Sequence, residues 1–271
     1  MTIRKYLAAV AIAVAQAKAA RAVFVGRLAF YAVLLVMYAR IWEMVGRQGA
    51  LGVFGHGDLI WYLAVTEWIA LSAPSLHTDI EADVRSGNVA YLLPRPVSYL
   101  WLRFSEALGT MLARMLVLGV FGFGLAMLLT RVSTTNGASV ALPSGGLLAL
   151  VCGALTAVVA ATLNLVFCAI IGLSAFFIED TSPIYWVWQK LSFVFGGLMF
   201  PLDIYPPAMR SIANVTPFPS LLYAPGRIAI GAEPAFVWRT VIVLAAWTVF
   251  GVTCAHFAFR RALKALEING G

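Results

Sequence analysis

The sequence predicts an all-α integral membrane protein with six transmembrane helices, an N-terminal surface helix and an outward re-entrant hairpin between the fifth and sixth helices. Composition is the first reason: 62% of the 271 residues are hydrophobic and 11% are charged, whereas about 25% are charged in a typical soluble domain. The placement of charge is the second reason. Residues 115–130 and 147–177 carry none, while residues 77–103 carry seven charged side chains when His77 is counted. Charges gathered between long apolar stretches are typical of a chain that crosses a membrane several times.

The first half of the chain supplies the surface helix and four predicted spans. Residues 3–21 are rich in alanine and interrupted by basic and polar side chains, which favours a helix on the membrane surface over one that crosses it. The spans are predicted at about residues 22–42, 58–76, 105–130 and 147–177. The last of these is long enough to tilt or to extend beyond the bilayer.

The second half supplies the fifth span, a re-entrant segment and the sixth span. The fifth span is predicted at residues 184–201, where successive prolines begin to deny the helix its N–H donors. Residues 202–234 mix apolar side chains with turn residues, which predicts short helices dipping into the outer membrane face. The sixth span is predicted at residues 236–257. The re-entrant segment is defined by Pro201, Pro206, Pro207, Pro217, Pro219, Pro225 and Gly226.

These elements form a single transmembrane domain over residues 1–271. It divides into the surface helix at 1–21, the six-span region at 22–258 and a cytoplasmic tail at 259–271. An even number of spans places both termini on one side of the membrane. Twelve of the 19 Lys and Arg residues then fall on that side, six fall on the opposite side, and Arg114 lies within a span. Because cytoplasmic loops carry the excess of Lys and Arg, both termini are predicted to be cytoplasmic.

Several classes of function are disfavoured by features that the sequence lacks. Lys and Arg beside the spans explain the formal charge of +7, and no basic patch interleaved with aromatic side chains indicates nucleic-acid binding. Cys152, Cys168 and Cys254 lie in apolar stretches without metal-ligand spacing, so no metal site is predicted. The phosphate loop G-x-x-x-x-G-K-[ST] is absent, so the chain is not expected to hydrolyse ATP by itself.

The loop between the second and third spans predicts a short amphipathic helix. Thr78 or Asp79 is expected to cap its N-terminus, and Gly87 is expected to end it in the left-handed conformation. Ile80 and Val84 share one face at i, i+4 spacing, which gives the helix an apolar side. From its length alone, this segment would be an ordinary polar connection between two helices.

Two stretches of the sequence resemble ABC-2 type permeases. Residues 83–98, DVRSGNVAYLLPRPVS, are similar to a family segment with the pattern D-I-x-S-G followed by L-L-x-R-P. Residues 195–206, FGGLMFPLDIYP, together with residues 216–219 and 223–231, resemble the fifth helix and outward re-entrant hairpin of that family. With the six spans and the surface helix, the resemblance covers nearly the whole chain.

The resemblance implies a permease subunit of an ATP-binding cassette transporter in the bacterial inner membrane. Besides membrane lipid it implies two partners, an ATPase subunit docked on the cytoplasmic loops and a second six-span permease. ATP and Mg would be held by the ATPase subunit, and no cofactor by this chain. Export is the expected direction because the outward segments are short.

The resemblance also assigns roles to individual residues. ATPase coupling is carried over to Asp79, Ile80, Glu81, Asp83, Val84, Arg85, Ser86, Gly87, Leu92, Leu93, Pro94, Arg95 and Pro96. A second cytoplasmic contact is expected at Glu179, Asp180, Thr181 and Ser182. In this interpretation, Ile80 and Val84 pack into a cleft of the ATPase, and the surrounding acids meet basic residues of that partner.

Two pairs of opposite charge are also considered. Glu81 and Arg85 stand at i, i+4 spacing on the loop helix and are expected to pair. Glu67 and Arg114 lie within the second and third predicted spans, both about 14 to 15 Å from the inner face at 1.5 Å of rise per residue. They either pair with each other or line the substrate route, unless Arg114 extends toward the inner interface.

Two other classes of function compete with a transporter subunit. An ion-coupled secondary carrier would use Glu67, but such carriers commonly contain repeated helix sets with paired broken helices, and the sequence predicts one re-entrant region. An intramembrane enzyme would need a G-x-S-x-G or H-E-x-x-H motif, or an acid–histidine cluster at one depth, and the sequence has none. The chain is therefore not expected to be an enzyme.

Overall fold

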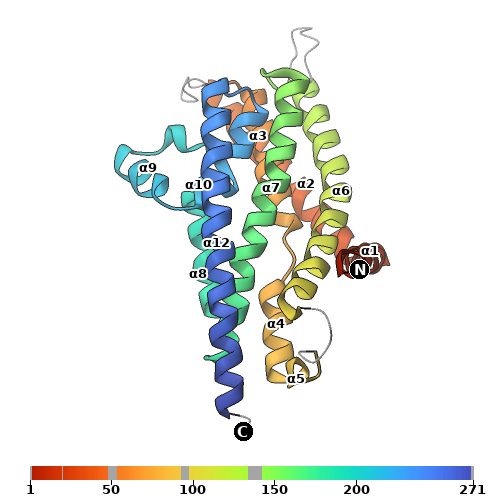
Figure 1. Ribbon diagram of the computed structural model, residues 1–271. Helices are drawn as coiled ribbons and strands as arrows, with labels where there is room; N and C mark the ends of the chain where they lie inside the picture. Colours follow the sequence, from red (N-terminus) through yellow and green to blue (C-terminus); the bar gives the residue numbers. More distant parts are fainter. Residues whose placement is uncertain (1, 20, 48–53, 93–97, 134–141, 270–271) are drawn as a thin grey trace.

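The computed structural model describes residues 2–19, 21–47, 54–92, 98–133 and 142–269. Within these ranges the chain forms helices, turns and loops, and no strand (Figure 1). The α-helices are α1 Thr2–Ala19, α2 Arg21–Arg47, α3 His56–Ser72, α4 Leu76–Arg85, α5 Asn88–Leu92, α6 Tyr99–Ser133, α7 Gly146–Leu173, α8 Ser182–Phe195, α9 Pro207–Asn214, α10 Phe218–Leu221, α11 Tyr223–Ala229 and α12 Pro234–Asn269, and the 3-10 turns are η1 Ser174–Phe176 and η2 Leu202–Ile204.

Five helical segments of the described chain are long and apolar enough to cross a membrane, where the sequence predicted six. They are α2, α3 continued by α4, α6, α7 continued by η1, and α12. Helices α2, α6 and α7 contain the predicted first, third and fourth spans almost entirely. The final helix α12 runs on to Asn269, so most of the predicted tail continues this helix. These helices confirm a multi-pass, all-helical protein.

The boundary between α3 and α4 differs from the prediction. The second span was expected to reach Leu76, but α3 ends at Ser72. The reason lies in Pro74, because a proline disfavours the helical conformation of the residue before it. The next helix begins at Leu76, so the cap expected at Thr78 or Asp79 is wrong.

The predicted fifth span is also shorter than expected. Helix α8 ends at Phe195, well before Pro201, and its 14 residues fall short of the roughly 20 that a membrane span needs. A glycine ends it: Gly197 has a φ of 66°, its N–H donates to the carbonyl of Val194 at 3.3 Å, and the N–H of Leu198 donates to that of Phe193 at 3.1 Å. These two bonds form a Schellman motif, so the glycine pair stops the helix before the prolines can.

Between α7 and α12 the chain runs from one end of the bundle to the other as a series of short helices. Helix α8 starts beside α4, where Thr181 donates to Glu81. The end of α11 lies at the opposite end of the bundle, where the N–H of Gly145 donates to the carbonyl of Ile230 at 3.2 Å. Helices α9, α10 and α11 therefore occupy the half of the bundle beyond α8 (Figure 1).

The prolines and the glycine of the predicted re-entrant segment have defined positions between the short helices. Pro201 precedes η2, Pro206 and Pro207 start α9, and Pro217 precedes α10, which contains Pro219. Pro225 and Gly226 lie in α11. A Cβ added at Gly226 would lie 2.8 Å from the ring of Tyr62, so this glycine lets α11 approach α3 closely.

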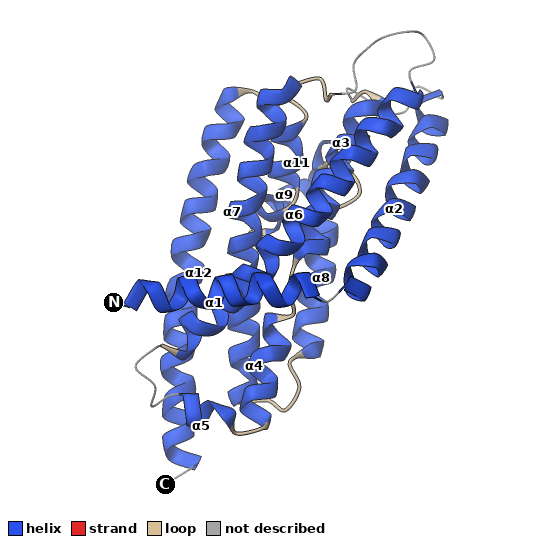
Figure 2. Cartoon of the chain, turned by 90° about the vertical axis from the view of Figure 1, so that its right-hand side faces the viewer, coloured by secondary structure: helices blue, strands red, loops and turns tan. Residues whose placement is uncertain are grey.

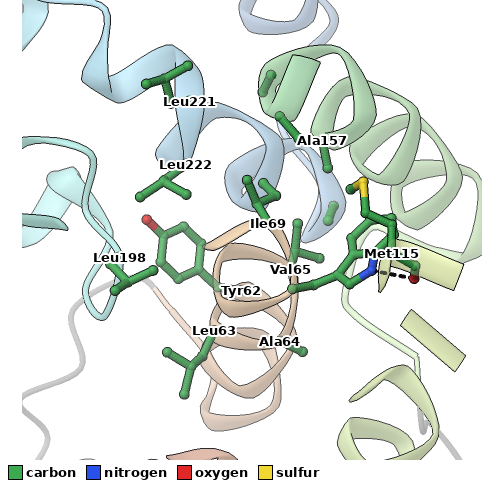
Figure 3. Packing of buried hydrophobic residues seen from close by; sticks show 14 of the residues in the cluster. Tyr62, Leu63, Ala64, Val65, Ile69, Met115, Ala157, Leu198, Leu221 and Leu222 are labelled. Atoms are coloured by element: carbon green, nitrogen blue, oxygen red, sulfur yellow. Dashed lines mark hydrogen bonds between the residues drawn. The ribbon is translucent and has the colours of Figure 1, made fainter. Parts of the chain in front are cut away.

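Helix α3 is the centre of the bundle. Every residue from Leu59 to Ile69 is buried, and α2, α6, α7 and α11 surround it. Figure 3 shows Tyr62 pointing toward Leu198 and Leu222, and its hydroxyl donates to the carbonyl of Gly197. Trp68 donates its indole N–H to the carbonyl of Met115 on α6 at 2.7 Å. Aromatic side chains thus supply both apolar contact and hydrogen bonds between α3 and its neighbours.

Helix α1 lies across the bundle instead of along it (Figure 2). It packs against α6 at Gly109, where an added Cβ would lie 2.9 Å from the Cβ of Ala13. In Figure 2, α4, α5 and the C-terminal end of α12 lie below the level of α1, while most of α2, α3, α6 and α7 lies above it. A helix oriented in this way suits the plane of a membrane surface, as the sequence predicted.

Candidate functional site

The part of the molecule below α1 contains α4, α5 and the residues 177–182 that join η1 to α8. We call these three segments the α4 unit. They include both stretches for which the sequence predicted cytoplasmic contacts. The structure brings the two stretches together although they are about 100 residues apart in the chain.

Side-chain bonds join α4 to the 177–182 segment. Thr181 donates its backbone N–H to Oε2 of Glu81 at 2.9 Å, and its hydroxyl donates to the same oxygen. The guanidinium of Arg85 donates to the backbone carbonyl of Glu179. Arg85 and Glu81 also form the predicted ion pair, at 3.0 Å. Each charged side chain of this contact therefore has partners on both segments.

A second set of bonds joins α4 to α6. The carboxylate of Asp83 accepts from Nε and Nη2 of Arg103 at 2.6 and 2.7 Å, which is a bidentate ion pair. The hydroxyl of Tyr99 donates to the same carboxylate at 2.8 Å. Arg103 also donates to Glu106, one turn further along α6, at 2.7 Å. The buried carboxylate of Asp83 is thus fully engaged, and α4 is fixed on two sides.

The apolar face of α4 packs inside the protein. Ile80 is completely buried, and a Cβ added at Gly172 of α7 would lie 3.0 Å from its side chain. Val84 is half-buried and packs against the same core. The ring of His77 stacks on Tyr185 of α8, with 3.7 Å between the ring centroids. The expectation that Ile80 and Val84 enter a cleft of a partner is therefore wrong for Ile80, because α7 already covers this face.

The exposed surface of the α4 unit is formed by other residues. Asp79, Ser86 and Gly87 are exposed on α4 and its C-terminus, and Gly87 has a φ of 73°, which confirms the predicted left-handed position. On α5, Tyr91 is 78% exposed, and on the 177–182 segment Phe177 is 59% exposed.

A groove of about 580 Å³ runs between α4 and the 177–182 segment. It is lined by Arg85, Ala175, Phe176, Phe177, Ile178 and Glu179. Sequence reasoning assigned Phe177 to the end of a span and so missed it. The one feature of the sequence that could have indicated its exposure is its position next to the charged residues 179–180. Leu92 is half-buried, and Leu93, Pro94, Arg95 and Pro96 lie outside the described residues.

Hydrogen bonds also organise the start of α8. Ser182 donates its backbone N–H to Oδ1 of Asp180 at 2.9 Å. Bonds from the side chain and the backbone of Ser182 lower the pKa of the Asp180 carboxyl. A carboxylate at this position also suits the positive end of the helix dipole.

The two intramembrane charges do not pair with each other in the described part of the chain. Arg114 donates Nη1 to the carbonyl of Ala73 at 2.8 Å, and Arg27 of α2 donates to the carbonyl of Leu71. Both cations therefore bind the C-terminal end of α3, where the helix dipole favours positive charge. Glu67 is 3% exposed and lines a separate cavity of about 630 Å³, together with Arg27 and Tyr185.

The described side chains offer no cluster of three or more His, Cys, Asp or Glu that could hold a metal ion. Asn164 connects helices, as its Oδ1 accepts the indole N–H of Trp188 at 3.1 Å. The candidate site is therefore a surface groove with both apolar and charged walls, supported by hydrogen bonds and ion pairs.

The long apolar helices define a multi-pass membrane protein. The family model for ABC-2 family transporter proteins matches residues 28–270, nearly the whole chain, and the chain belongs to this family. It is therefore an ABC-2 permease, a membrane transport component that is not itself catalytic. No curated protein matches the chain.

Proposed function

We propose that the chain is the permease subunit of an ATP-driven exporter and that a separate ATPase subunit docks on the α4 unit. The groove carries this proposal, because apolar side chains are exposed there on a unit that projects beyond the surface helix. Exposed apolar patches of this kind mark interaction sites. The chain lacks a phosphate loop of its own, so ATP and Mg would be bound by the partner.

The ion pairs within the chain hold the proposed docking surface firmly to the membrane helices. Force applied to the 177–182 segment reaches α8 directly, and force applied to α4 reaches α6 through Asp83 and Arg103. A unit held on two sides can move the helices above it together. The bonds within the α4 unit therefore support a role in coupling.

The proposed membrane arrangement has six crossings, with both termini on the cytoplasmic side of the inner membrane. The fifth crossing is made by α8 together with residues 196–201, since the chain passes from one end of the bundle to the other between α7 and α12. In this arrangement residues 202–234 form the outward re-entrant hairpin. The α4 unit and α1 then face the cytoplasm.

A second permease, identical or related, would complete the substrate route. The cavity that contains Glu67 lies against α2, α3 and α8, and its walls include Phe30, Tyr185 and Trp186. An acid among aromatic side chains suits the polar lining of a route for an amphipathic substrate.

Co-purification tests the docking proposal. The chain is co-expressed with an ATP-binding cassette ATPase of its own genome that co-purifies with the wild type, and the Tyr91→Ala/Phe177→Ala variant is compared with Ile212→Ala/Val215→Ala, which removes exposed apolar groups at α9. Since interface anchors each contribute more than about 1 kcal/mol, the first variant is expected to retain at least about tenfold less ATPase subunit. Equal retention by both variants would contradict docking on the α4 unit.

An ion-coupled carrier is the second candidate, and the burial of Glu67 in a cavity favours it. Vesicles without ATP separate the two proposals. An ion gradient that drives uptake through the wild-type chain, but not through Glu67→Gln, would support the carrier and contradict the ATP-driven permease.

A further inference from the structure

A small cleft lies where α1, α2 and α6 meet. Its volume is about 80 Å³, well above the roughly 10–15 Å³ that a single water molecule needs in a cavity. The cleft is lined by Ala17, Val23, Phe24, Arg27, Thr110 and Arg114. It lies close to the level at which α1 crosses α6 at Gly109, five residues before Arg114. A cleft of this size accommodates a headgroup fragment but no whole lipid.

The two arginines of the cleft form fewer hydrogen bonds than their guanidinium groups can donate. Each donates to one backbone carbonyl at the end of α3, at Leu71 for Arg27 and at Ala73 for Arg114. A guanidinium has five N–H groups, so most of these donors remain without a protein acceptor in the described structure. Both arginines line the same cleft, which therefore contains two positive charges.

No carboxylate of the described residues forms an ion pair with Arg27 or Arg114 within 4.0 Å. Glu67 lines a neighbouring cavity together with Arg27, but it does not bond to either arginine in the described structure. An arginine within a membrane span is costly unless it meets an anion, a backbone carbonyl or water. A negatively charged group with several acceptor oxygens would supply the missing acceptors of both side chains.

We propose that this cleft binds the phosphate group of an anionic membrane lipid. Two guanidinium groups are the donors that bind phosphate best, because they form parallel charge-assisted hydrogen bonds. Val23 and Phe24 give the same cleft an apolar side suited to the glycerol and the first acyl carbons. Lipid is the favoured source because Ala17 of α1 lines the cleft, and a helix on the membrane surface lies at the boundary between headgroups and acyl chains. The proposal does not depend on the ATPase partner.

Native mass spectrometry of the purified full chain tests this proposal. The protein in detergent is mixed with phosphatidylglycerol, with diacylglycerol of the same acyl chains, or with inorganic phosphate. The wild type is expected to retain phosphatidylglycerol at least about tenfold more than diacylglycerol, since charge-assisted bonds to phosphate are strong. Equal retention of the two lipids would overturn the proposal. Saturation by inorganic phosphate that phosphatidylglycerol does not displace would overturn the lipid as source.

Two variants locate the binding. Arg27→Gln/Arg114→Gln should reduce phosphatidylglycerol retention about tenfold, while Arg40→Gln/Arg239→Gln removes the same charge from exposed positions near the other end and should retain wild-type binding. Ala17→Phe fills the cleft without touching the bonds to α3 and should also reduce retention, which keeps the test valid if the arginine variant does not fold. Wild-type retention by Ala17→Phe and by a folded arginine variant would contradict the site.

Discussion

Helices α3 and α4 follow each other in the chain, yet different forces hold them in place. In α3, side chains on all sides are buried, and contact with the neighbouring helices is made by aromatic rings and small residues. In α4, one face is apolar against α7, and the other side chains are fixed by ion pairs and hydrogen bonds to α6 and to the 177–182 segment. Residues 73–75, between the two helices, separate the apolar packing of α3 from the charged contacts of α4.

The difference shows how one chain combines an apolar helix bundle with a charged unit at one end, which we propose as the docking surface. Charged groups are rare in the bundle because lipid cannot solvate them. Below α1 charged side chains are common, because the exposed members of the ion pairs remain in contact with water. The packed region is expected to determine whether the protein folds, and the charged region is expected to determine how it responds to a partner.

The largest effect is expected from a change in the packed region. A Cβ added at Gly153 of α7 would lie 2.5 Å from the Cβ of Ala229 and 2.6 Å from its Cα. Because the added atom meets the backbone of α11 and not a flexible side chain, Gly153→Val should separate α7 from α11 and lower the stability by more than about 4 kcal/mol, above the range typical of overpacking. Gly124→Val is the control, because an added Cβ at Gly124 meets nothing within 4 Å. Equal melting temperatures in detergent would contradict the close packing.

Removing the ion pair of α4 is expected to have the next largest effect. Asp83→Asn leaves Arg103 with Glu106 as its remaining carboxylate and should destabilise the α4 unit by about 2–4 kcal/mol, below the upper figure for a fully buried pair because Arg103 is partly exposed. Limited proteolysis should cut between α4 and α6 while the melting temperature of the bundle changes little. Arg40→Gln, which breaks an exposed ion pair with Glu43, should change cleavage by no more than experimental error.

A smaller effect is expected at the contact with the 177–182 segment. Thr181→Val removes the hydroxyl that donates to Glu81 but keeps the backbone N–H donor. The loss of one hydrogen bond to a charged group should weaken this contact by about 1–2 kcal/mol. Hydrogen exchange at residues 177–182 measures it. Thr253→Val, whose hydroxyl donates only to the carbonyl one turn earlier on α12, should leave exchange at this segment unchanged.

The smallest effect is expected from pH. Because its pKa is lowered in the folded protein, the Asp180 carboxylate contributes stability that is present above its ordinary pKa of about 3.9 and is lost as the pH falls through the lower folded value. Acidification should therefore loosen the 177–182 segment before it affects α3. A wild-type pH profile identical to that of Asp180→Asn would show that this carboxylate has no part in the response.

The sequence predicted the long helices well because apolar length is a local property. The spans near α2, α6 and α7, the pair Glu81–Arg85 and the left-handed Gly87 all follow from residues a few positions apart. The predicted end of α8 was wrong because Gly196 and Gly197 terminate the helix before the chain reaches Pro201. The burial of Ile80 was not predicted because it depends on Gly172 in α7, far along the chain. The bond between Glu81 and Thr181 was not predicted for the same reason, since the two residues are also far apart in the sequence.

Site-specific photo-crosslinking tests the central claim most directly. A photoreactive amino acid is placed at Tyr91 of α5 or at Ile212 of α9, which are both exposed but lie on opposite sides of the level of α1. In cells that also produce the ATPase subunit that co-purifies with the wild type, irradiation should crosslink this subunit to position 91 and not to position 212. Crosslinking from position 212 alone, or from neither position in an assembled transporter, would contradict docking at the α4 unit.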